Sequence, residues 1–164
     1  MGHSTAVAPP KSGLWCSIWS SVGVSLPWEL YQQYGDKAML AEHYASMKRY
    51  IQFVLDEYVD KKTGLIVQHH QWGDLGDWLS PSYEKDDKSL VWECYFIFDL
   101  DILSQMAKAL GKTEDAAWLP RLANERRAFF RKTFVDEATG KTICSWYDAE
   151  RKGQLIATQT SYAR

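Results

Sequence analysis

Apolar residues recur at helical intervals along almost the whole chain from residue 14 onward. The clearest amphipathic segment follows Gly35, and its apolar positions fall at steps of three and four: Leu40, Tyr44, Met47, Ile51, Val54, Leu55 and Tyr58. Asp36 stands at the expected N-cap position of this segment. A preceding helix is predicted over about residues 14–34, with Pro27 kinking or dividing it. A tight turn at Gly35 then joins the two helices into an antiparallel hairpin.

A second helical pair is predicted in the other half of the chain. The segment from about residue 89 to residue 110 is apolar on most of its circumference, which is typical of a helix inside a larger structure. Three carboxylates occur within it and are expected to be either paired or functional: Glu93, Asp99 and Asp101. Gly111 ends this helix, and Thr113 is predicted to cap the next, which extends to about residue 134 with a bend at Pro120.

Two segments interrupt the helical pattern. Residues 60–87 predict a long loop with a short extended piece near its start, and residues 136–152 predict a hairpin or loop bounded by turn signals. A last helix is predicted to begin near Ala157. The plan of inner helix, turn, outer helix and long loop occurs twice, so the sequence predicts an all-α fold. This plan is the unit of an α/α toroid, and two units do not close one.

The long loop holds two pairs of glycine and aspartate, each beside a tryptophan, within residues 71–81. The residues with side chains suited to a ligand are Trp72, Asp74, Asp77 and Trp78. A carboxylate accepts hydrogen bonds from sugar hydroxyls, and an indole ring stacks on the C–H face of a pyranose, so the pattern indicates a sugar site. In the alternative interpretation, the tryptophans fill the core and the aspartates form turns.

Composition narrows the classes of function. The net charge of −2 arises from interspersed charges without a basic stripe, which argues against nucleic-acid binding. No apolar stretch is long enough to span a membrane, and the segment from residue 14 to residue 26 is rejected as a signal peptide. Three cysteines without metal-ligand spacing are interpreted as buried thiols in a reducing compartment. The adjacent histidines at positions 69 and 70 do not predict a metal site, and no cofactor is expected.

The domain organisation expected from these patterns is simple. Residues 1–13, rich in alanine, proline and serine, are predicted to be a disordered tail, and residues 14–164 a single helical domain. The tryptophan content, at 8 residues, is higher than a helical core needs and is typical of carbohydrate-active proteins or of large interfaces. The sequence does not distinguish a cytoplasmic from a periplasmic location.

Several motifs, taken in order, resemble the catalytic (α/α)6 barrel of bacterial α-L-rhamnosidases, glycoside hydrolase family 78. They cover essentially residues 14–164 and comprise Pro27-Trp28-Glu29-Leu30-Tyr31-Gln32-Gln33-Tyr34-Gly35-Asp36, Met47-Lys48, Gly76-Asp77-Trp78-Leu79, Ala109-Leu110-Gly111-Lys112 with Asp115-Ala116, and Gln159-Thr160-Ser161-Tyr162-Ala163. The resemblance implies a partial (α/α)6 barrel of four to five helices and a rhamnose-containing carbohydrate as the ligand.

By this resemblance, Asp77 and Trp78 line the rhamnose subsite, whereas Trp72 and Asp74 support the loop. Trp19 is similar to a tryptophan that the family places before a glycine and a substrate-binding aspartate. This chain instead has Ser20 and Ser21, and a serine cannot replace the charge of a carboxylate.

The family's two catalytic glutamates have no counterpart in residues 1–164. The general acid lies in an Asp-x-x-x-Arg-Glu segment that this sequence does not contain, and the general base lies in a segment further along the family's chain. Inverting hydrolysis needs two carboxyl groups about 6.5–9.5 Å apart. The local acids that remain as candidates are Asp74, Asp77, Glu84 and Glu93. No catalytic residue is assigned on this basis.

Three hypotheses remain open at this stage. The first is a fragment of an inverting α-L-rhamnosidase that is inactive alone. The second is a non-catalytic helical carbohydrate-binding protein derived from the same barrel. The third is an interaction module that self-associates through exposed seams of the barrel, because large apolar patches usually mark interfaces.

Overall fold

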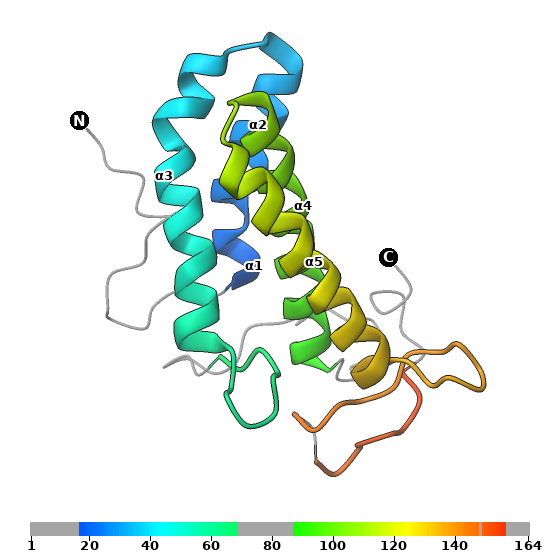
Figure 1. The fold of residues 1–164 in the computed structure, drawn as a ribbon. Coiled ribbons are helices and arrows are strands. Elements are labelled where there is room, and N and C mark those ends of the chain that lie inside the picture. The colour runs from blue at the N-terminus through cyan, green and yellow to red at the C-terminus, as the bar shows by residue number, and fades with distance from the viewer. Residues whose placement is uncertain (1–16, 69–86, 148, 157–164) are drawn as a thin grey trace.

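The computed structural model describes residues 17–68, 87–147 and 149–156. Its elements are α1 (Ser17–Ser20), α2 (Val22–Tyr34), α3 (Lys37–Phe53), a π-helical turn (Val54–Tyr58), α4 (Lys88–Ala109) and α5 (Thr113–Phe134). The long helices form two antiparallel hairpins, α2 with α3 and α4 with α5, that pack side by side (Figure 1). Within the described ranges the remaining chain forms isolated β-bridges and no β-strand, so the all-α prediction is confirmed.

The first hairpin turns where the sequence predicted. Gly35 adopts a φ of 70°, a conformation that costs a glycine little, and its amide donates to the carbonyl of Tyr31. Asp36 then caps α3 with Oδ1, which accepts from the amides of Ala38 at 2.9 Å and Met39 at 3.1 Å. The last turn before Val59 is π-helical, a change of period that the apolar spacing did not reveal.

The helix that precedes Gly35 is interrupted at Ser21 and not at Pro27, so the predicted division was misplaced. Helix α2 continues through Pro27, which withholds only one amide from the helical hydrogen bonds. Ser21 keeps helical dihedral angles, and its carbonyl still accepts from the amides of Val24 and Ser25. The interruption therefore separates α1 from α2 with little change in direction of the backbone.

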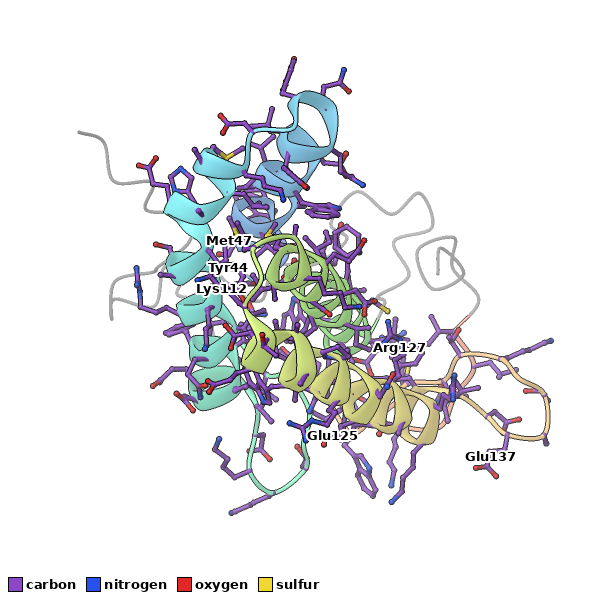
Figure 2. All side chains as sticks on the ribbon, turned by 45° about the horizontal axis from the view of Figure 1, so that its top comes forward. Tyr44, Met47, Lys112, Glu125, Arg127 and Glu137 are labelled. Carbon is purple, nitrogen blue, oxygen red and sulfur yellow. The ribbon has the colours of Figure 1, made fainter. Side chains whose placement is uncertain are left out.

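The second hairpin turns at Gly111, which has a φ of 69°. Asp87 caps α4 by accepting from the amide of Leu90 at 3.3 Å. The predicted cap of α5 was wrong, because Thr113 is its first residue and the N-cap position is Lys112, which makes no side-chain cap hydrogen bond. Lys112 instead places its amine 5.1 Å from the ring centre of Tyr44, and Figure 2 shows these two residues close together.

Two of the motifs that suggested the family meet in the packing of α3 against α5. Lys48 Nζ lies 2.6 Å from Asp115 Oδ1, and the hydroxyl of Tyr44 donates to Asp115 Oδ2 at 3.0 Å. Burial opposes ionisation of Asp115, but the bonds from Lys48 and Tyr44 outweigh it and hold the pKa of Asp115 below its usual value. These motif residues therefore join the middle of α3 to the first turn of α5 and stabilise the fold.

The main core lies between the four long helices and is built from buried residues of each. Its largest fully buried side chains are Leu40, Met47, Tyr50, Ile51, Trp92, Phe96, Leu100, Leu103 and Met106. A smaller core lies under the two loops and comprises Leu65, Leu90, Val91, Phe134, Cys144 and Ile156. Among the described helices, none combines the length and apolar character needed to cross a membrane.

Candidate functional site

The antiparallel hairpins bring three helix ends and two loops to one end of the bundle. The start of α4 lies there with the ends of α3 and α5, at the bottom of Figure 1, whereas α1 lies higher, beside the middle of α4. The loop after α3 is closed by a bridge between Val59 and Ile66, and the loop after α5 by bridges from Val135 to Thr142 and from Ile143 to Leu155. We call this the loop end of the bundle.

Trp19 is the predicted sugar-binding residue that the structure describes. Its side chain on α1 is 66% exposed, whereas the next two residues, Ser20 and Ser21, are buried. A tryptophan exposed to this degree leaves a large aromatic surface available to a ligand. Trp19 therefore meets the accessibility that stacking on a sugar requires.

The other four predicted site residues, Trp72, Asp74, Asp77 and Trp78, lie outside the described residues, as does Glu84. The described residues that flank this segment are Gln68 and Asp87, and both are buried at the loop end. The segment therefore leaves and rejoins the described structure at the loop end.

The hydroxyl of Ser21 is hydrogen-bonded to a residue within the protein. Its Oγ donates to Asp99 Oδ1 at 2.5 Å, across the contact between the α1–α2 junction and α4. Asp99 is 0% exposed, and burial raises its pKa to about 8, against the opposing hydrogen bonds from Ser21 and Tyr50. Where the resemblance led us to expect an acid available to substrate, the chain has a buried serine bonded to a buried acid from another helix.

The structure pairs the other two carboxylates of α4 with arginines of α5. Arg126 binds Glu93 with two nitrogens, with Nε 2.7 Å from Oε1 and Nη2 against Oε2, and it also donates to the carbonyl of Gly64 at 3.0 Å. Arg127 contacts Asp101 in a half-exposed pair. Each of the three carboxylates of α4 therefore has a partner, in agreement with the prediction that they are paired or functional.

Glu93 cannot serve as an accessible catalytic carboxylate in this arrangement. Its side chain is 0% exposed, and both of its oxygens are bound by Arg126. Burial raises the pKa of Glu93, and the guanidinium opposes that rise because it favours the charged form. Of the four local acids considered from the sequence, Glu93 is therefore structural.

The hairpin after α5 adds aromatic residues to the loop end that sequence analysis did not single out. The amide of Ser145 donates to Asp87 Oδ2 at 2.6 Å, and Tyr147 packs edge-on against Trp92 with ring centres 5.3 Å apart. These contacts hold Trp146 at the surface, 60% exposed. The sequence signal that could have indicated Trp146 is its position between the turn glycines Gly140 and Gly153. Trp72 and Trp78 were selected because they also lie near glycines.

Within the described residues, no three histidine, cysteine, aspartate or glutamate side chains gather in a way that could hold a metal ion. Two exposed indoles, Trp19 on α1 and Trp146 in the hairpin after α5, offer aromatic surfaces on which a ligand ring can stack.

Comparisons with known proteins identify the architecture. The sequence matches the bacterial alpha-L-rhamnosidase 6 hairpin glycosidase domain over residues 2–163. The α-L-rhamnosidase of Streptomyces avermitilis, solved in complex with L-rhamnose, superposes with a TM-score of 0.62 at 32% identity over 76% of this chain and 11% of that chain. The enzyme from Dictyoglumus thermophilum gives a TM-score of 0.63 at 32% identity, over 74% of this chain and 13% of that chain.

The fold is therefore a partial (α/α)6 barrel, of the class of six-hairpin glycosidase domains. Sequence relatives point to the same family. The α-L-rhamnosidase of Streptomyces avermitilis is 33% identical over 136 residues, which are 82% of this chain and 12% of the relative. That of Alteromonas sp. strain LOR is 28% identical over 74% of this chain and 13% of the relative. The chain belongs to the bacterial α-L-rhamnosidase family, and it spans about an eighth of the length of these relatives.

Proposed function

We propose that this chain forms one wall of the rhamnose pocket of an inverting α-L-rhamnosidase and binds rhamnose without hydrolysing its glycosides alone. The observation that carries the proposal is the exposed indole of Trp19 on α1, which packs against α4, the helix that the Gly-Asp-Trp segment precedes in sequence. Membership of the rhamnosidase family supplies the substrate class. Asp77 and Trp78 contact the sugar, and Trp72 and Asp74 support their loop.

The proposal that the chain lacks catalytic activity rests on its carboxylates. Hydrolysis with inversion requires one protonated carboxyl group at the leaving oxygen and a second that activates water, about 6.5–9.5 Å away. In the described structure Glu93, Asp99 and Asp101 are each committed to a partner within the bundle. The remaining local candidates, Asp74, Asp77 and Glu84, lie outside the described residues.

Binding and turnover can be measured separately. We expect calorimetric titration with L-rhamnose to give a weak but saturable signal, and Trp19→Ala or Trp78→Ala to weaken binding by about tenfold or more, since loss of a stacked indole removes about 1.4 kcal/mol. Tyr34→Ala is the matched control, because Tyr34 is 74% exposed on α2 at the opposite end. We expect no release of p-nitrophenol from p-nitrophenyl α-L-rhamnoside.

Two outcomes would contradict this proposal. If both tryptophan variants bound rhamnose as the wild type does, the pocket would lie elsewhere. Robust hydrolysis that Asp77→Ala abolished would show that the chain carries its own catalytic acid.

Self-association is the alternative that a specific observation favours. One face of α1 and α2 carries exposed apolar residues at helical spacing: Trp19, Val22, Leu26 and Leu30. Such a stripe is usually covered by another helix, and the proposed occupant is a second copy of the chain. We expect light scattering to show concentration-dependent dimers that Leu26→Lys disperses, with Leu155→Lys, at an exposed loop position, as the control. A monomer at all concentrations would remove this alternative.

A further inference from the structure

The polar cluster of Ser21, Tyr50 and Asp99 lies inside an otherwise apolar part of the bundle. Ser21 comes from the α1–α2 junction, Tyr50 from α3 and Asp99 from α4, and all three side chains are buried. Tyr50 itself belongs to the main apolar core, as do Leu100 and Leu103, which follow Asp99 on α4. Apolar residues would fill this space at a lower desolvation cost, so the cluster calls for an explanation beyond packing.

Within the described residues, the carboxyl group of Asp99 has no cationic partner. Oδ1 accepts from Ser21, and Oδ2 has no hydrogen-bond partner among the described residues. The groups that hydrogen-bond to Asp99 are the Ser21 hydroxyl and the Tyr50 phenol, whereas Arg126 and Arg127 of α5 bind Glu93 and Asp101. Burial raises the pKa of Asp99 to about 8, so near neutral pH it is predominantly the protonated acid.

The cluster is connected to the proposed sugar-stacking residue by a very short path. Trp19 precedes Ser21 by two residues, and the helix that carries it has only four residues. Helix α1 rests on α4 and α2, so its orientation depends on contacts made by its own last turn and by the junction that follows. The Ser21–Asp99 hydrogen bond is a contact of this kind, and it lies on the inner side while Trp19 faces outward.

We propose that Asp99 is a positioning residue, which orients Trp19 by holding the α1–α2 junction through Ser21. The inference rests on the proposed function of Trp19. It adds that proton binding to Asp99 controls the orientation of Trp19. The neutral acid fits the buried site, whereas a carboxylate with no cation beside it is stable only if the junction moves to admit water. Ionisation of Asp99 therefore shifts Trp19 and weakens its stacking on the sugar.

Fluorine NMR tests the coupling without a sugar. The protein is labelled with 5-fluorotryptophan, and the Trp19 resonance is identified by its loss in Trp19→Phe. We expect this resonance to shift with pH, with a midpoint near the pKa of about 8. The shift should disappear in Asp99→Asn and persist in Asp101→Asn, the matched loss of a half-exposed carboxylate on the same helix. A Trp19 resonance that is insensitive to pH, or a shift that survives in Asp99→Asn, would overturn the proposal.

A second variant keeps the test decisive if Asp99→Asn fails to fold. Ser21→Ala leaves the acid in place and removes its link to the junction, so the Trp19 resonance should no longer follow the ionisation of Asp99. Circular dichroism at each pH establishes that the variants stay folded over the range compared. If Trp19 still follows Asp99 in folded Ser21→Ala, the junction is not held through the serine and the proposal fails.

Rhamnose binding separates this inference from the proposed function. Calorimetry at pH 6.5 and pH 9.5 should show affinity falling by about tenfold in the wild type and unchanged in Asp99→Asn. Absence of rhamnose binding at both pH values would reject the proposed function, while the NMR titration would still decide whether Asp99 positions Trp19. Binding that is equally strong at both pH values would reject the control by Asp99 and leave the proposed function standing.

Discussion

Arg126→Leu is expected to lower the free energy of unfolding by about 3–5 kcal/mol, because it leaves the carboxylate of Glu93 buried without its counter-ion. Arg126 supplies two nitrogens to Glu93, donates to the carbonyl of Gly64 and lies 4.6 Å from the ring centre of Phe129. It thereby joins α4, α5 and the loop after α3. Urea denaturation at pH 7, followed by circular dichroism, measures the loss.

Two further variants isolate the cause. Arg127→Leu removes the neighbouring arginine of α5, whose pair with Asp101 is half-exposed, and should cost no more than about 1 kcal/mol. The double variant Glu93→Leu/Arg126→Leu removes both charges and should recover much of the stability that Arg126→Leu loses. Equal losses in Arg126→Leu and Arg127→Leu would show that burial of the pair does not matter.

Asp99→Asn is expected to become increasingly stable relative to the wild type as pH rises from 4 to 8. Burial in the folded state raises the pKa of Asp99 to about 8 from its ordinary value of 3.8. Between these values the unfolded chain releases the proton and the folded chain retains it, so unfolding is favoured by higher pH. The wild type should lose up to about 1.4 kcal/mol of stability per pH unit from this group.

Asparagine removes this dependence because it does not titrate and can still accept the hydrogen bond of Ser21. The free energies of unfolding of the two proteins should therefore converge near pH 4 and differ by several kcal/mol near pH 8, as an order of magnitude. Urea titrations at four or more pH values measure the trend, with Asp101→Asn as the control at a half-exposed carboxylate. Parallel curves for the wild type and Asp99→Asn would show that Asp99 does not retain its proton on folding.

The two hairpins could be predicted because their signals are local. Gly35 and Gly111 adopt the left-handed conformation that ends a helix, and Asp36 satisfies the amides at the start of the next. The apolar period then marks which face of each helix enters the core. These features act within a few residues, so they can be recognised in the sequence without knowledge of the rest of the fold.

The wrong predictions concern choices that depend on neighbours in space. Pro27 was expected to kink or divide its helix, but the division lies at Ser21, whose hydroxyl bonds to α4. Thr113 was expected to cap α5, but it is the first residue of the helix. The N-cap position is Lys112, whose amine lies over the ring of Tyr44 of α3. In both cases the observed helix boundary coincides with a contact between helices, whereas local propensity predicted the boundary at another residue.

The sequence by itself determined the all-α fold, the hairpin turns and the rhamnosidase family, since periodicity, caps and ordered motifs are written along the chain. It also drew attention to Trp19 and to the segment containing Trp72, Asp74, Asp77 and Trp78. Only the tertiary structure decided the use of the acids on α4, where Glu93 is bound by Arg126 and Asp99 by Ser21. The physical reason is that the cost of a buried carboxylate depends on its partners, and those partners lie 33 and 78 residues away in sequence.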